Sequence, residues 1–149
     1  MATLASKALG KRQALQFDCA ETCTVLGNET LLTILVRNLL DNAIRYSPPS
    51  ACVNVCLQRS ADTRSADTFM LTIEDGGPGL APGDLQRLGE RFFRMPGSVE
   101  SGSGLGWSIV RRIAAAHHFH LSLDRSKQLG GLVVRVSGPA AARLQRIQS

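Results

Sequence analysis

The stretch ETLLTILVRNLLDNAIRY, residues 29–46, has apolar residues that recur every three or four positions. This spacing predicts an amphipathic helix with one broad apolar face. Asn28 is a suitable N-cap for the helix, and the two prolines of SPPS, residues 47–50, end it. The residues expected on the apolar face are Leu31, Leu32, Leu35, Val36, Leu39 and Ala43.

Strands and a second long helix are predicted on either side of this helix. The expected strands are ALQFD (14–18), CTVLG (23–27), 51–59, 68–74, HLSLD (120–124) and LVVRVS (132–137). Residues 60–68 read as a hairpin loop, and the other expected segments are a short helix (82–93), a polar loop (94–104) and a helix (105–119). Strands and helices do not alternate regularly, so a doubly wound sheet is disfavoured. The order of strands and helices along the chain predicts a two-layer α/β sandwich, in which helices cover one face of a mixed sheet.

The composition is that of one folded soluble domain. The chain has 149 residues, of which 44% are hydrophobic and 19% charged, with a net charge of +5. No basic patch interleaved with aromatic residues is present, so nucleic acid is not an expected partner. The sequence has neither an apolar run of membrane-spanning length nor a signal peptide, and we expect a soluble, cytosolic chain from a parent protein that could itself be membrane-bound.

The four cysteines form two C-x-x-x-C pairs, Cys19 with Cys23 and Cys52 with Cys56. This is not the usual zinc-ligand spacing, and no histidine lies close to either pair in the sequence. Free thiols in a reducing compartment are therefore favoured over a metal site or a disulfide. Cys52 and Cys56 also fit one face of an alternating strand.

The glycine-rich stretch SGSGLGWSIV, residues 101–110, precedes the second apolar-faced helix. It lacks the lysine of a P-loop, and it does not have the glycine spacing of a dinucleotide fingerprint. Gly104 and Gly106 would let backbone N–H groups approach a phosphate at the helix N-terminus. From this stretch alone, a phosphate site and a hinge without a ligand are equally good interpretations.

Polar side chains follow the edge of the apolar face on the first helix. Asn38 and Asn42 are four residues apart, Arg45 lies one turn further on the same stripe, and Tyr46 borders the apolar side. Amide oxygens are suitable ligands for Mg²⁺, and an arginine can pair with phosphate. The structural alternative is a solvated helix edge, which suits Asn42 alone better than the whole set.

A third cluster follows the predicted strand 68–74. In EDGGPGL, Asp75 comes at the strand end and is followed by Gly77 and Gly79. A carboxylate in this place can accept a hydrogen bond from an exocyclic amine such as N6 of adenine. The glycines would let a planar base lie against the backbone. The structural alternative is an ordinary tight turn.

These three clusters, in their order along the chain, resemble the catalytic and ATP-binding domain of bacterial sensor histidine kinases. NLLDNAIRYS is similar to the N box of that family, DGGPG to the G1 box, ERFFRM to the F box and GSGLGWSIV to the G2 box. The similarity spans about residues 28–137. Within the family, GERFFRMPGSVESGSGLG is most like the subgroup that contains the QseC and PmrB sensors.

The resemblance implies the ATP-binding fold that these kinases share with DNA gyrase, Hsp90 chaperones and MutL proteins, known as the Bergerat fold. It implies ATP and Mg²⁺ as cofactors, with Asn38, Asn42 and Arg45 as the catalytic set and both asparagines as metal ligands. The domain would span residues 13–138, after a linker or an artificial boundary at 1–12 and before a tail at 139–149. The implied nucleotide-binding residues are Asn42, Arg45, Tyr46, Asp75, Gly77, Gly79, Phe92, Phe93, Arg94, Gly102, Gly104, Leu105 and Gly106.

The resemblance also implies a reaction, partners and a location. The chain would transfer the γ-phosphate of ATP to a histidine on the dimerisation domain of its parent kinase, upstream of a response regulator. The isolated domain would be a monomer unable to phosphorylate itself. The parent would lie in the bacterial inner membrane with this domain in the cytoplasm. Gly76 and Trp107 depart from the family, in which asparagine and leucine are usual.

Asn38 separates a kinase from the other enzymes of this fold. The related ATPases carry a glutamate at that position, which activates water as a general base. An asparagine cannot take up that proton, so transfer to another protein is favoured over hydrolysis. A non-catalytic ATP-binding module and an ATPase of the same fold remain the alternatives, and the asparagine also argues against a stand-alone serine kinase of the anti-sigma type.

Overall fold

The computed structural model describes residues 2–19, 22–60, 67–87 and 105–141. Its helices are α1 (Ala2–Gly10), α2 (Glu29–Tyr46), α3 (Pro82–Arg87) and α4 (Gly106–Ala116). Its strands are β1 (Ala14–Cys19), β2 (Cys52–Ser60), β3 (Thr68–Asp75), β4 (His120–Arg125) and β5 (Leu132–Pro139).

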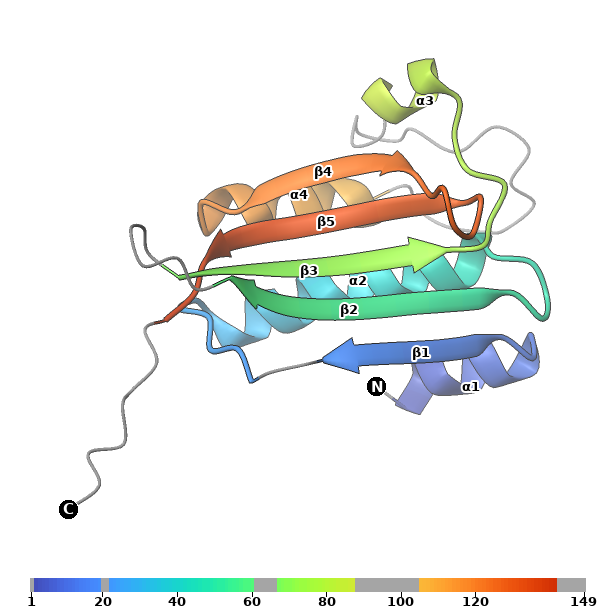
Figure 1. Cartoon of the computed structure of the whole chain (residues 1–149), viewed down its shortest axis with the longest axis horizontal. Helices are drawn as coiled ribbons and strands as arrows, with labels where there is room; N and C mark the ends of the chain where they lie inside the picture. The colour runs from blue at the N-terminus through green and yellow to red at the C-terminus, as the bar shows by residue number, and fades with distance from the viewer. Residues whose placement is uncertain (1, 20–21, 61–66, 88–104, 142–149) are drawn as a thin grey trace.

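The strands form one mixed sheet in the order β1-β2-β3-β5-β4. β1 and β2 are parallel, and the other neighbouring pairs are antiparallel. A parallel pair needs a crossover connection, which α2 supplies between β1 and β2. Helices α2 and α4 cover the same face of the sheet (Figure 1). The predicted two-layer α/β sandwich is therefore confirmed.

Helix α2 begins and ends where the sequence predicts. The side chain of Asn28 accepts a hydrogen bond from the N–H of Leu31 at 3.0 Å, and Ser47 is the C-cap. The buried residues of α2 are Leu35, Leu39, Leu40, Ala43 and Ile44. The predicted apolar face is thus wrong at its edges, because Leu31 is exposed whereas Leu40 and Ile44 are buried.

Helix α1 explains this shift of the buried face. It packs against α2 and places Leu4 and Ala8 in the same hydrophobic core. The loop after α1 also binds the C-terminal end of α2, because Gln13 Nε2 donates hydrogen bonds to the carbonyl oxygens of Ile44 and Ser47. The first segment is therefore packed against the core, and the division of the chain at residues 12 and 138 stays a prediction.

The predicted strand at residues 23–27 is wrong. Thr24 accepts one backbone hydrogen bond from Ala141 at 2.8 Å, but this segment forms no ladder with any described strand. The chain instead turns at Gly27 toward α2, and a Cβ on Gly27 would lie 2.7 Å from the ring of His117. Packing against the end of α4 therefore replaces strand pairing here.

The remaining expected elements are confirmed where the structure describes them. β2 and β3 pair as antiparallel neighbours, as a hairpin requires, although residues 61–66 of their connection lie outside the described residues. The helix expected at 82–93 is present from Pro82 to Arg87, and its remainder and the loop 94–104 also lie outside them. The described helices include none with the length and apolar character needed to span a bilayer.

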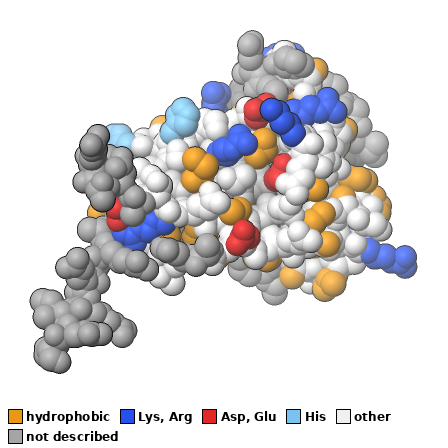
Figure 2. All heavy atoms as spheres, in the orientation of Figure 1, with side chains coloured by type: hydrophobic (Ala, Val, Ile, Leu, Met, Phe, Trp, Pro, Cys, Tyr) orange, Lys and Arg blue, Asp and Glu red, His pale blue; other side chains and the backbone are white. Residues whose placement is uncertain are grey.

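The face of the sheet opposite the helices is the one seen in Figure 2, where apolar, acidic and basic side chains are interspersed. On β2, Val53 and Val55 are buried toward the helices, so Cys52 and Cys56 alternate onto the other face. All four cysteines of the chain are free thiols. The alternation of strand residues therefore accounts for the spacing of Cys52 and Cys56.

Candidate functional site: a pocket between two helices and the sheet

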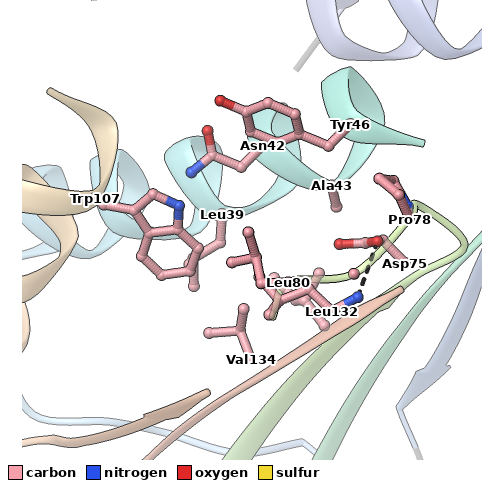
Figure 3. A pocket seen from close by; sticks show the side chains of 12 residues that line it. Leu39, Asn42, Ala43, Tyr46, Asp75, Pro78, Leu80, Trp107, Leu132 and Val134 are labelled. Carbon is pink, nitrogen blue, oxygen red and sulfur yellow. Dashed lines mark hydrogen bonds between the residues drawn. The ribbon is translucent and has the colours of Figure 1, made fainter. Parts of the chain in front are cut away.

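A pocket opens where α2, α4 and the ends of β3 and β5 meet (Figure 3). It brings together four residues that the sequence singles out in separate clusters: Asn42, Tyr46, Asp75 and Gly79. The other lining residues are Leu39, Ala43, Ile73, Pro78, Leu80, Trp107, Leu132 and Val134. The pocket is therefore largely apolar, with a few polar groups at fixed positions, as small-molecule sites usually are.

Asp75 ends β3 and is only 6% exposed. Its Oδ1 accepts hydrogen bonds from the backbone N–H groups of Gly77 at 2.9 Å and Leu132 at 3.1 Å. Its Oδ2 has no hydrogen-bond partner among the described residues and is directed into the pocket (Figure 3). The backbone thus holds one carboxylate oxygen in place and leaves the other available as an acceptor.

The environment of Asp75 also changes its acidity. Burial raises the pKa of the Asp75 carboxyl above its ordinary value of 3.8, because desolvation disfavours the charged form. The hydrogen bonds from Gly77 and Leu132 act in the opposite direction, and the charge of Glu74 raises the pKa further. A buried carboxylate with a raised pKa in a pocket is typical of a functional site.

Glycines let the backbone close around this carboxylate. A Cβ on Gly77 would lie 2.8 Å from the carbonyl oxygen of Tyr46, and Gly79 has a φ of +71°. The tightest position is Gly131, where a Cβ would lie 2.2 Å from both the carbonyl oxygen and Oδ1 of Asp75. The sequence analysis did not select Gly131, although the Gly130–Gly131 pair directly before a predicted strand could have indicated a position of close backbone packing.

Asn38 and Asn42 face the first residue of α4. A Cβ on Gly106 would lie 3.2 Å from Asn38 Oδ1 and 3.7 Å from either amide atom of Asn42. Asn38 Nδ2 donates to the carbonyl oxygen of Ile34 at 2.8 Å, which leaves its Oδ1 as an acceptor. Asn42 Nδ2 is buried without a hydrogen-bond partner among the residues that the structure describes. A buried amide lacking a partner calls for a ligand or a water, and the two amide oxygens suit a hard cation.

Arg45 makes a different contact from the one predicted for it. Its guanidinium forms an ion pair with Asp41 Oδ2 at 2.6 Å, and Lys7 Nζ of α1 binds Asp41 Oδ1, also at 2.6 Å. Asp41 does not line the pocket. A contact between Arg45 and phosphate stays a prediction.

Two further predicted residues, Leu105 and Gly106, lie at the start of α4. Leu105 is the N-cap residue of α4, and its carbonyl oxygen accepts hydrogen bonds from the Ser108 hydroxyl and the Ile109 N–H. The next residue after Gly106, Trp107, is buried and lines the pocket. The residues outside the described part of the chain are Phe92, Phe93, Arg94, Gly102 and Gly104.

Comparisons with known proteins agree with this geometry. Residues 27–142 match the model of the family described as "Histidine kinase-, DNA gyrase B-, and HSP90-like ATPase". The sensor protein QseC of Escherichia coli strain K12 is 48% identical over 111 residues, which cover 74% of this chain and 22% of QseC.

Solved structures show the same relationship. The mycobacterial sensor histidine kinase MprB aligns with a TM-score of 0.74 at 29% identity, covering 94% of each chain. The cytoplasmic segment of QseC aligns with a TM-score of 0.62 at 28% identity, covering 94% of this chain and 70% of that segment. The chain thus spans about a fifth of the length of full QseC. It belongs to the histidine kinase-, DNA gyrase B- and HSP90-like ATPase family, as an ATPase domain of the kind found in QseC-like sensor histidine kinases.

Proposed function

We propose that this chain binds Mg-ATP and donates the γ-phosphate to a histidine on a separate dimerisation domain of a sensor kinase. The observation that carries this proposal is Asp75, a buried carboxylate with one oxygen held by two backbone N–H groups and the other directed into the pocket. Adenine presents an N–H₂ donor that such an oxygen can accept. Guanine presents a carbonyl oxygen at the corresponding ring position, which a carboxylate repels.

The phosphates would extend from the base toward α4. That direction leads past Asn42 to Gly106, where the N-terminal end of α4 favours negative charge. Asn38 and Asn42 would hold the metal ion through their amide oxygens. Bound Mg²⁺ would neutralise charge on the phosphate oxygens during transfer. Phe92, Phe93, Arg94, Gly102 and Gly104 are proposed as parts of a lid over the nucleotide, on the strength of the family resemblance.

The same residues disfavour hydrolysis. Asn38 offers no carboxylate to deprotonate a water, and the neighbouring Asp41 is occupied by Lys7 and Arg45. In the transfer reaction, an imidazole nitrogen attacks the γ-phosphorus in line, so the P–N bond forms as the P–O bond to ADP breaks. The imidazole proton leaves to solvent. By similarity to QseC, we propose that the parent is an inner-membrane kinase that passes phosphate to a response regulator.

Phosphotransfer between separate proteins tests this function. The chain is mixed with the dimerisation domain of QseC and with ATP labelled at the γ-phosphate, and acid-labile label on the acceptor is measured. We expect labelling that requires Mg²⁺ and disappears when the acceptor histidine is replaced by alanine. Asn42→Ala should abolish the labelling, whereas Asn54→Ala, which changes an amide on β2 outside the pocket, should not.

The outcomes separate the alternatives. Tight ATP binding without labelling of any histidine would favour a non-catalytic ATP-binding module. Release of inorganic phosphate without an acceptor would favour an ATPase. Failure of the chain to bind ATP would overturn the proposed function altogether.

A further inference from the structure

Trp107 stands at a position where leucine is usual in the family. The proposed function assigns no role to this residue. It is the second residue of α4 and the only tryptophan in the chain. Its side chain is 8% exposed and forms part of the pocket wall. Its indole Nε1 makes no hydrogen bond with any described residue and is not among the buried atoms that lack a partner, so the N–H is accessible to a ligand.

A second donor without a partner lies on the same side of the pocket. Asn42 Nδ2 is buried and makes no hydrogen bond to any described residue, and Gly106, adjacent to Trp107, packs against the Asn42 amide. Figure 3 shows the indole nitrogen on the edge of the ring that faces Asn42. Two N–H donors that face the same space need an acceptor between or beside them.

We propose that Trp107 is a nucleotide-contacting residue whose indole N–H donates a hydrogen bond to a phosphate oxygen of bound ATP. This inference rests on the proposed function, because it takes the pocket to be the ATP site. Asp75 provides the acceptor at the base end of the pocket, whereas Trp107 Nε1 and Asn42 Nδ2 provide two donors where α4 begins. Phosphate oxygens are acceptors only, so they match this set of donors. A leucine at position 107 cannot make the contact.

A matched pair of variants tests the contact. Trp107→Phe keeps a buried aromatic ring and removes the N–H, and Phe119→Leu changes an aromatic packed on Phe69 away from the pocket. Calorimetric titrations with ATP, ADP, AMP and adenosine measure affinity. In Trp107→Phe we expect about tenfold weaker binding of the nucleotides, the loss typical of a hydrogen bond to a charged group, and unchanged binding of adenosine. Phe119→Leu should leave all four affinities unchanged.

The unmodified protein provides an independent measurement. Because the chain has one tryptophan, its amide spectrum contains one indole N–H resonance. A new hydrogen bond to phosphate should move this resonance downfield with ATP and ADP, and much less with adenosine. The same shift with adenosine as with ATP would overturn the contact.

These results distinguish the inference from the proposed function. Should the unmodified chain bind neither ATP nor adenosine, both proposals fail. The unmodified chain can instead bind ATP. In that case the Trp107 contact alone is overturned if Trp107→Phe binds ATP with the same affinity, or if its affinities for ATP and adenosine fall by the same factor. The AMP titration then shows whether the contact is made by the α-phosphate.

Discussion

The two ends of the pocket differ in how completely their polar groups are satisfied. At the base end, Asp75 Oδ1 accepts two backbone N–H groups, and Gly131 fits closely against the same residue. At the phosphate end, Asn42 Nδ2 has no hydrogen-bond partner within the described part of the chain, although Arg45 nearby is already paired with Asp41. The base end is thus formed before a ligand arrives, whereas the phosphate end holds donors whose partners a nucleotide would supply. Four measurements test this contrast.

Replacing the central carboxylate should have the largest effect. Asp75→Asn keeps an oxygen for the bonds from Gly77 and Leu132 but can present an amide N–H₂ to the N6 amine of adenine. We expect ATP affinity to fall by about 10- to 100-fold and selectivity over GTP to disappear. Stability without ligand should be unchanged or higher, since no charge remains buried. Calorimetry with both nucleotides and thermal unfolding measure these effects, and unchanged ATP affinity would exclude Asp75 as the adenine acceptor.

Lowering the pH should imitate that substitution. The pKa of Asp75 is raised in the folded state, so the folded protein binds more protons than the unfolded chain at pH values between 3.8 and that raised pKa. The stability contributed by Asp75 is therefore fully present below pH 3.8 and is lost as the pH rises through the folded pKa. ATP affinity should change in the opposite sense, weakening as the carboxylate protonates. Asp75→Asn should remove both dependences in pH-resolved titrations and unfolding curves.

Adding a methyl group behind Asp75 should disturb the preformed end. Gly131→Ala places a Cβ where Asp75 backbone and side-chain atoms already lie, so we expect a loss of about 1–3 kcal/mol in the free energy of unfolding. ATP affinity should fall with it as Asp75 moves. Gly10→Ala is the control, because a Cβ there meets nothing within 4 Å. Denaturant unfolding measures both, and equal stability of the two variants would contradict the close fit.

Releasing Arg45 should have the smallest effect. Asp41→Asn removes the ion pair with Arg45 and a negative charge near the proposed phosphate site. We expect ATP to bind a few-fold more tightly at low salt, with adenosine unaffected and the gain lost at high salt. Asp18→Asn, on exposed β1, changes the net charge equally and should not alter binding. A decrease in ATP affinity for Asp41→Asn would show that the ion pair supports the site.

Local pattern accounts for most of the predicted elements. Three features depend only on residues that are close in the sequence: the N-cap at Asn28, the extent of α2 and the alternating burial along β2. Each of them could therefore be predicted from the sequence. The strand expected at 23–27 did not form, because this segment packs against the end of α4 and does not pair with either edge strand of the sheet, β1 or β4. Burial of Leu40 was missed because the packing of α1 against α2 was not predicted.

The helices, most of the strands and the residue types from which a nucleotide site can be built follow from the sequence alone, since helix and strand periodicity and capping are local properties. The folded structure was needed to show that Leu132, 57 residues from Asp75, donates to its carboxylate, and that Gly131 fits behind it. That contact follows from the register of β3 with β5, which pairs Glu74 with Val133. Register is a collective result of side-chain packing across the sheet, and no single segment specifies it.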